Sequence, residues 1–102
     1  MSNKNVVFSK NPDELLEVDI CAVSGWDGFD KLIQFMKNEY SIEVVDSVDG
    51  PDARCWKLKA DGQEFELRYD DPYGNSIVAT SEFGEAIVRK IGLDLEDRLK
   101  AL

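Results

Sequence analysis

Histidine is absent from this sequence of 102 residues, and cysteine occurs only twice. Without histidine the chain lacks the commonest general base near neutral pH and the partner that activates a serine or cysteine nucleophile. Cys21 and Cys55 form no CxxC motif, and a zinc site would need carboxylates to complete its ligand set. We therefore expect two reduced thiols, no catalytic residues, no metal site and no cofactor.

Long apolar runs are missing as well. No stretch approaches the roughly 20 apolar residues that span a bilayer, and the start, MSNKNVVFSKNPDE, lacks the apolar block of a secretory signal. A hydrophobic share of 43% suits one globular domain, residues 1–102, with a single core. These features predict a cytoplasmic protein with no membrane partner.

Basic residues are scarce. Twelve Lys and Arg stand against twenty-one Asp and Glu, which gives a formal net charge of −9. A field of this sign repels nucleic-acid backbones and attracts basic partners. We therefore expect no direct binding of nucleic acid and a basic protein as partner. The alternative is that the charge serves solubility alone.

The apolar pattern indicates an α+β fold. In GWDGFDKLIQFMKNEY the apolar residues recur every three or four positions, which predicts a helix over residues 25–40 with Trp26 on its buried side. NVVFS, LEVDI and SIEVVDSV have the composition or alternation of strands. After residue 80 the pattern predicts two helices, 82–91 and 95–101, with Phe83 facing inward and Gly92 ending the first of them.

The pair Asp61-Gly62 predicts a two-residue hairpin turn of type I′. It aligns strands 53–60 and 63–69 so that a buried Trp56 faces Leu67, while Lys57 faces Glu66 in a pair of opposite charge. Residues 76–80 add a third strand, so the three form an antiparallel meander. We expect the three helices to cover one face of this antiparallel sheet, and we leave the order of the other strands open.

The stretch DDPYGN joins the second and third strands of this meander. A calcium loop spaces its oxygens at alternate positions, whereas Asp70 and Asp71 are adjacent and Pro72 follows them, so a turn is favoured over a metal site. The aromatic ring of Tyr73 at such a tip is typical of a protein-binding loop.

Acidic residues recur on the polar side of the predicted strands. Glu17 and Asp19 share one side of their strand, and Glu64 and Glu66 share one side of theirs. They predict an acidic strip on the sheet face away from the helices. The interpretation of each pair as an ordinary solvated face stays open. The residues predicted to bind the partner are Glu64, Glu66, Asp70, Asp71 and Tyr73.

The hairpins LKADGQEFELRYDDPYGNSIVA, followed by a capped helix, and the charge of −9 resemble the bacterial immunity proteins. These are acidic α+β or α/β domains that neutralise a cognate toxin, often a basic nuclease. The chain outline also resembles a small gammaproteobacterial family of similar length with no assigned function. The first resemblance implies a non-catalytic inhibitor of a basic toxin, and it assigns no role to a single residue. Two alternatives stay open: an enzyme or ligand-binding domain that uses carboxylates, and a domain that pairs with itself as a homodimer.

Overall fold

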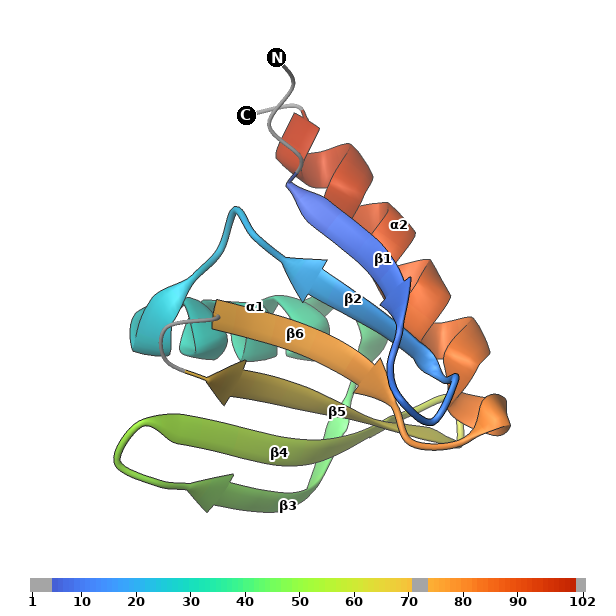
Figure 1. Cartoon of the computed structure of the whole chain (residues 1–102), viewed down its shortest axis with the longest axis horizontal. Helices are drawn as coiled ribbons and strands as arrows, with labels where there is room; N and C mark the ends of the chain where they lie inside the picture. Colours follow the sequence, from blue (N-terminus) through green and yellow to red (C-terminus); the bar gives the residue numbers. More distant parts are fainter. Residues whose placement is uncertain (1–4, 71–73, 101–102) are drawn as a thin grey trace.

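The computed structural model describes residues 5–70 and 74–100, and within them six antiparallel strands form one open sheet (Figure 1). The sheet order is β1-β2-β6-β5-β4-β3. The last strand therefore lies between β2 and β5 and joins the N-terminal hairpin to the meander. The α+β prediction is confirmed. The strands are β1 (Val6–Lys10), β2 (Leu16–Ile20), β3 (Glu43–Asp49), β4 (Ala53–Ala60), β5 (Gln63–Asp70) and β6 (Gly74–Ala79).

The β4–β5 hairpin has the predicted register. Trp56 lies opposite Leu67, and the turn residues Asp61 and Gly62 have φ angles of 51° and 76°. Both values are in the left-handed region that a type I′ turn requires. Trp56 is half-buried rather than fully buried. The third strand of the meander, expected over 76–80, runs from Gly74 to Ala79.

The predicted charge pair across this hairpin is replaced by a pair along one strand. Lys57 and Glu66 are Cα partners, but the carboxylate of Glu66 binds Arg68, with Nη2 2.6 Å from Oε1. Residues two apart on a strand point to the same face, and the guanidinium offers several donors in a fixed plane. Arg68 therefore competes successfully with Lys57 for this carboxylate.

Helix α1 (Gly25–Tyr40) has the predicted bounds and buries Phe29, Leu32, Ile33 and Met36. The prediction that Trp26 is buried is wrong, since 39% of it is exposed. Trp26 belongs to the first turn of α1, where one ring face covers a guanidinium and the rest remains in solvent.

Helix α2 (Glu85–Lys100) is continuous and follows the 3₁₀ turn η1 (Glu82–Gly84), so the prediction of two helices over 82–91 and 95–101 is wrong. Gly92 lies inside the helix. A Cβ there would be 2.8 Å from Cε2 of Phe8 and 3.0 Å from Cγ2 of Val18. The glycine permits close approach to the sheet instead of ending the helix. Phe83 points outward, with 86% of it exposed, because η1 turns Gly84 toward β5.

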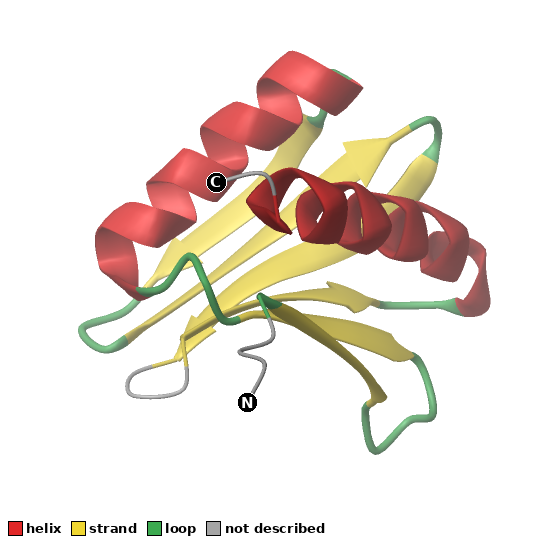
Figure 2. Cartoon of the chain, turned by 90° about the horizontal axis from the view of Figure 1, so that it is seen from above, coloured by secondary structure: helices red, strands yellow, loops and turns green. Residues whose placement is uncertain are grey.

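Both helices cover the same face of the sheet (Figure 2). The core lies between these two layers and is formed by the apolar residues of the strands and the inner helix stripes. Its largest fully buried side chains include Phe29, Phe65, Met36, Leu58, Leu67, Ile77 and Ile91. Among the described residues, no helix is long and apolar enough to cross a membrane. The other face of the sheet carries the polar side chains of the strands.

The two cysteines are free thiols, as expected. Cys21 follows β2, and Cys55 lies on β4, with β6 and β5 between these strands. Three strand spacings of about 4.8 Å separate them by roughly 14 Å. That distance exceeds the reach of a disulfide.

Candidate functional site

The register places acidic residues of distant segments side by side on the face that points away from the helices. Asp19 on β2 pairs with Ser76 on β6, and Ser76 pairs with Arg68 on β5. One strand therefore separates the acids of β2 from the polar side chains of β5. Within the described strands, alternation puts seven carboxylates on this face, which we call the acidic face: Glu17, Asp19, Glu43, Asp46, Glu64, Glu66 and Asp70. The cations that share it are Lys57, Lys59 and Arg68.

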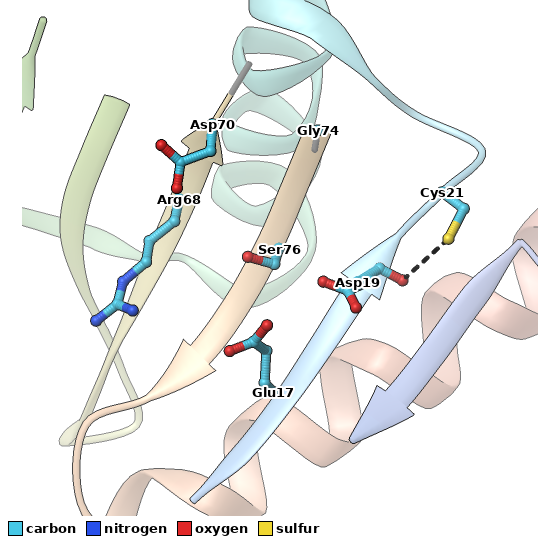
Figure 3. A pocket seen from close by; sticks show the side chains of 7 residues that line it. All are labelled: Glu17, Asp19, Cys21, Arg68, Asp70, Gly74 and Ser76. Carbon is cyan, nitrogen blue, oxygen red and sulfur yellow. Dashed lines mark hydrogen bonds between the residues drawn. The ribbon is translucent and has the colours of Figure 1, made fainter. Parts of the chain in front are cut away.

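A hollow of about 460 Å³ opens on the acidic face above β6 (Figure 3). Glu17 and Asp19 project from β2 on one side, and Arg68 and Asp70 project from β5 on the other, with Ser76 between them. The lining thus holds three carboxylates and one guanidinium, and the Arg68 side chain extends away from Glu17 and Asp19 (Figure 3). The full lining is Glu17, Asp19, Cys21, Arg68, Asp70, Gly74 and Ser76.

A second hollow, of about 440 Å³, lies on the other side of β5. Its lining includes the apolar Val48 of β3, Cys55 of β4 and the carboxylate-bearing Glu66. Arg68 and Asp70 line both hollows. These two residues therefore form a ridge along β5, with the more acidic hollow toward β2 and the more apolar one toward β3.

The carboxylates of the first hollow are partly removed from water. Burial raises the pKa of Glu17, the neighbouring charge of Asp19 raises it further, and Arg68 opposes both effects. Burial alone raises the pKa of Asp19. Val78 lies between Glu17 and Glu66 in the register and is itself buried, so apolar surface adjoins these acids. An added cation in this hollow would relieve the cost of keeping both carboxylates charged.

The structure brings some of the predicted binding residues together. Glu66 and Asp70 border the hollows. Glu64 is on the same face of β5 but belongs to its other end, next to the Asp61-Gly62 turn. Asp71 and Tyr73 lie outside the described residues. The predicted acidic strip of Glu17 and Asp19 joins the site, because β2 pairs with β6, an arrangement that only the strand order reveals.

Arg54 is a buried cation to which the sequence analysis assigned no role. It is 5% exposed, on the helix side of β4, and its guanidinium carbon lies 4.5 Å from the ring centroid of Trp26 and 4.2 Å from that of Phe29. Nη1 is 2.9 Å from Oδ1 of Asp30, and Nε is 2.9 Å from Oδ1 of Asp49. The sequence feature that could have indicated this site is an arginine at a position of β4 whose neighbours on the same face, Trp56 and Leu58, are apolar.

These contacts tie α1 to the β3–β4 hairpin. The indole N–H of Trp56 donates to the Asp49 oxygen that also accepts from Arg54. The bond from Trp56, and then the one from Arg54, hold the pKa of Asp49 below its usual range. Arg54 thus pairs with carboxylates at the edge of the helix layer and also borders the second hollow.

Among residues 5–70 and 74–100, no group of three or more His, Cys, Asp or Glu side chains is placed to hold a metal ion. Burial raises the pKa of both Glu17 and Asp19, and the charge of Asp19 adds to the effect at Glu17 alone. Carboxylates such as those that line the hollow can form charge-assisted hydrogen bonds with a lysine or arginine side chain.

Comparisons with known proteins identify no relative of this chain. A scan against protein-family models found no match, and neither a search of curated proteins nor a search of solved structures found one.

Proposed function

We propose that this chain is a cytoplasmic, non-catalytic binding protein whose acidic face receives a basic surface of a protein partner. The immunity-type inhibitor of a basic toxin is the most concrete form of this function. The observation that carries the proposal is the hollow above β6, which is lined by the carboxylates of Glu17, Asp19 and Asp70 and by Arg68, whose charge Glu66 already binds. Its chemistry favours a lysine or arginine of the partner.

Electrostatics supports this function in two ways. A net charge of −9 steers a basic partner toward the chain and speeds association. In the hollow, an entering cation meets carboxylates that burial has already deprived of part of their water. Folding has therefore already removed part of the water around these carboxylates. Formation of the new ion pair then requires less further desolvation, and its net free energy is more favourable.

A small-molecule function is the second candidate, and the volume of the hollow favours it. About 460 Å³ falls within the range of roughly 300–1,000 Å³ that is typical of ligand sites. Glu17 and Asp19 have raised pKa values, as acids and bases of active sites often do. Turnover of a small molecule that Glu17→Gln abolishes would favour an enzyme over a binding protein.

The experiment is a capture of partners from the native host with three baits of this chain. The first is wild type. The second carries Glu17→Lys and Asp70→Lys on the acidic face, and the third carries Glu96→Lys and Asp97→Lys on α2. Both variants change the net charge by the same amount, so they separate a local site from overall charge.

We expect a basic protein on the first and third baits and its loss from the second. Its association with wild type should slow as salt is added, because salt screens charges beyond a Debye length of about 8–10 Å. Equal retention by the second and third baits, or capture of acidic proteins and nucleic acids alone, would contradict the proposal.

A further inference from the structure

Phe83 is the most exposed large apolar side chain in the part of the chain that the structure describes. It is 86% exposed, compared with 61% for Val48 and 50% for Leu93. It belongs to η1, the 3₁₀ turn between β6 and α2. Single exposed apolar residues are common on protein surfaces, so exposure alone does not indicate a role. The way in which its turn is held does.

The turn that carries Phe83 is fixed to the sheet on both sides. Gly84 is buried, and a Cβ at this position would collide with the backbone carbonyl oxygen of Glu64 on β5. The backbone N–H of Ile87 donates to Oε1 of Gln63 at 3.2 Å, which ties the first turn of α2 to the same strand. The ring of Phe83 therefore projects from a segment that packs tightly against β5.

Glu85 binds the turn to the N-terminal strands β1 and β2. Its Oε2 accepts from the backbone N–H of Leu16 at 2.9 Å and from Nζ of Lys10 at 3.0 Å. The ion pair with Lys10 and then the bond from Leu16 keep the pKa of this carboxyl below its usual range, so it stays charged and bound at neutral pH. Contacts to β5 on one side and to β1 and β2 on the other thus restrain the backbone that carries Phe83.

An exposed ring on a restrained backbone has the properties of an interface anchor. Phenylalanine has few side-chain rotamers, and its backbone here is already ordered, so little conformational entropy remains to be lost when a partner buries the ring. Aromatic anchors that enter a pocket of the partner dominate many interfaces.

The charges around Phe83 identify the kind of pocket. Glu82 is exposed and precedes it in the turn. Glu64, also exposed and part of the acidic face, is the residue against which Gly84 packs. A pocket that takes this ring would lie beside the exposed Glu82 and close to the end of β5 at which the acidic face begins. Its own rim is therefore complementary when it carries lysine or arginine.

We propose that Phe83 is the apolar anchor of this interaction and that it inserts into an apolar pocket, rimmed by lysine or arginine, of the basic partner. The inference rests on the proposed function. It extends the interface from the hollow above β6 to the η1 end of β5. It also assigns separate roles: the carboxylates control association, and Phe83 controls the lifetime of the complex.

The test uses the full chain and the basic protein captured by the wild-type bait. Phe83→Ser should speed dissociation roughly 10–100-fold and leave association nearly unchanged. Leu93→Ser is the matched control, because Leu93 is also an exposed apolar residue and lies on α2. It should leave both rates unchanged. Both variants should remain folded at the assay temperature, since Phe83 is largely in solvent and Leu93 is half in solvent.

The outcomes separate the two proposals. If the acidic-face variant loses the partner while Phe83→Ser dissociates like wild type, the anchor is wrong and the proposed function stands. If neither variant weakens binding, or if wild type retains no basic protein, both fail. If the isolated chain forms dimers that Phe83→Ser abolishes, the occupant of this site is a second copy, and the anchor proposal for a basic partner is overturned.

Discussion

Arg68 is bound by Glu66, two residues before it on β5, with 2.6 Å between Nη2 and Oε1. Within the described lining of the hollow above β6, Arg68 is the single cation. Because Glu66 offsets its charge, Glu17, Asp19 and Asp70 decide the sign of the hollow. By neutralising Glu66, Arg68 makes this region one charge less negative and so limits the attraction for a basic partner.

Removing this cation should strengthen association. We expect Arg68→Gln to raise the association rate with the captured partner roughly two- to fivefold at low salt. Arg98→Gln is the control, because Arg98 makes an equivalent pair with Glu39, at 2.6 Å, between the helices. Stopped-flow or surface-plasmon kinetics measure both. A larger gain for Arg98→Gln would contradict the local account.

Glu17 should reduce stability at neutral pH while it supports binding. A carboxyl whose pKa is raised in the folded state contributes stability below its unfolded pKa and loses it as the pH rises through the folded value. Glu17→Gln should therefore raise the free energy of unfolding at neutral pH and slow association. The gain should vanish near pH 4 and below, where the wild-type carboxyl is protonated in both states. Urea denaturation at two pH values measures it, and a variant that is less stable at neutral pH would contradict it.

Arg54 should contribute strongly to the attachment of α1. Arg54→Ala removes a side chain that is 5% exposed and packs against three aromatic rings, so we expect a loss of roughly 2–5 kcal/mol, as for large-to-small core changes. Asp30→Asn should cost less than about 1 kcal/mol, because Asp30 is largely in solvent. Chemical denaturation followed by tryptophan fluorescence measures both. Equal costs would assign the effect to the ion pair instead of the packing.

Gly92→Ala should destabilise the fold against the trend of helix propensity. Alanine gains about 1 kcal/mol over glycine in an ordinary helix. Here its Cβ would press on Phe8 and Val18, and overpacking of this kind costs about 1–3 kcal/mol. The penalty should shrink in a Phe8→Leu background, where the ring is gone. A stabilised Gly92→Ala variant would show that α2 can move away from the sheet at little cost.

The features that sequence predicted well depend on neighbours along the chain. Asp61-Gly62 determines a turn and, through it, the whole β4–β5 register. The spacing of apolar residues determines α1, because its period is a local property. The acidic strip on one side of β2 follows in the same way.

The features that sequence missed depend on contacts between distant segments. A glycine such as Gly92 is typical of a helix end, but here it lies inside α2. Its position is a glycine because Phe8 and Val18 leave no room for a Cβ. Arg54 is buried because rings from α1 and β4 enclose it. The hollow itself exists because β6 returns to pair with β2, which no local pattern of this chain specifies. The candidate site could therefore be predicted in its charge but not in its shape.

The most direct test of the acidic face maps where a cationic ligand binds. We propose a titration of isotope-labelled chain with a short arginine-rich peptide, followed by amide chemical shifts at low and physiological salt. The account predicts the largest shifts on β2, β5 and β6 around the hollow, at Glu17, Asp19, Arg68 and Ser76, and their loss in the Glu17→Lys, Asp70→Lys variant. Shifts that are as large at Asp94, Glu96 and Asp97 of α2, or that persist in this variant, would contradict it.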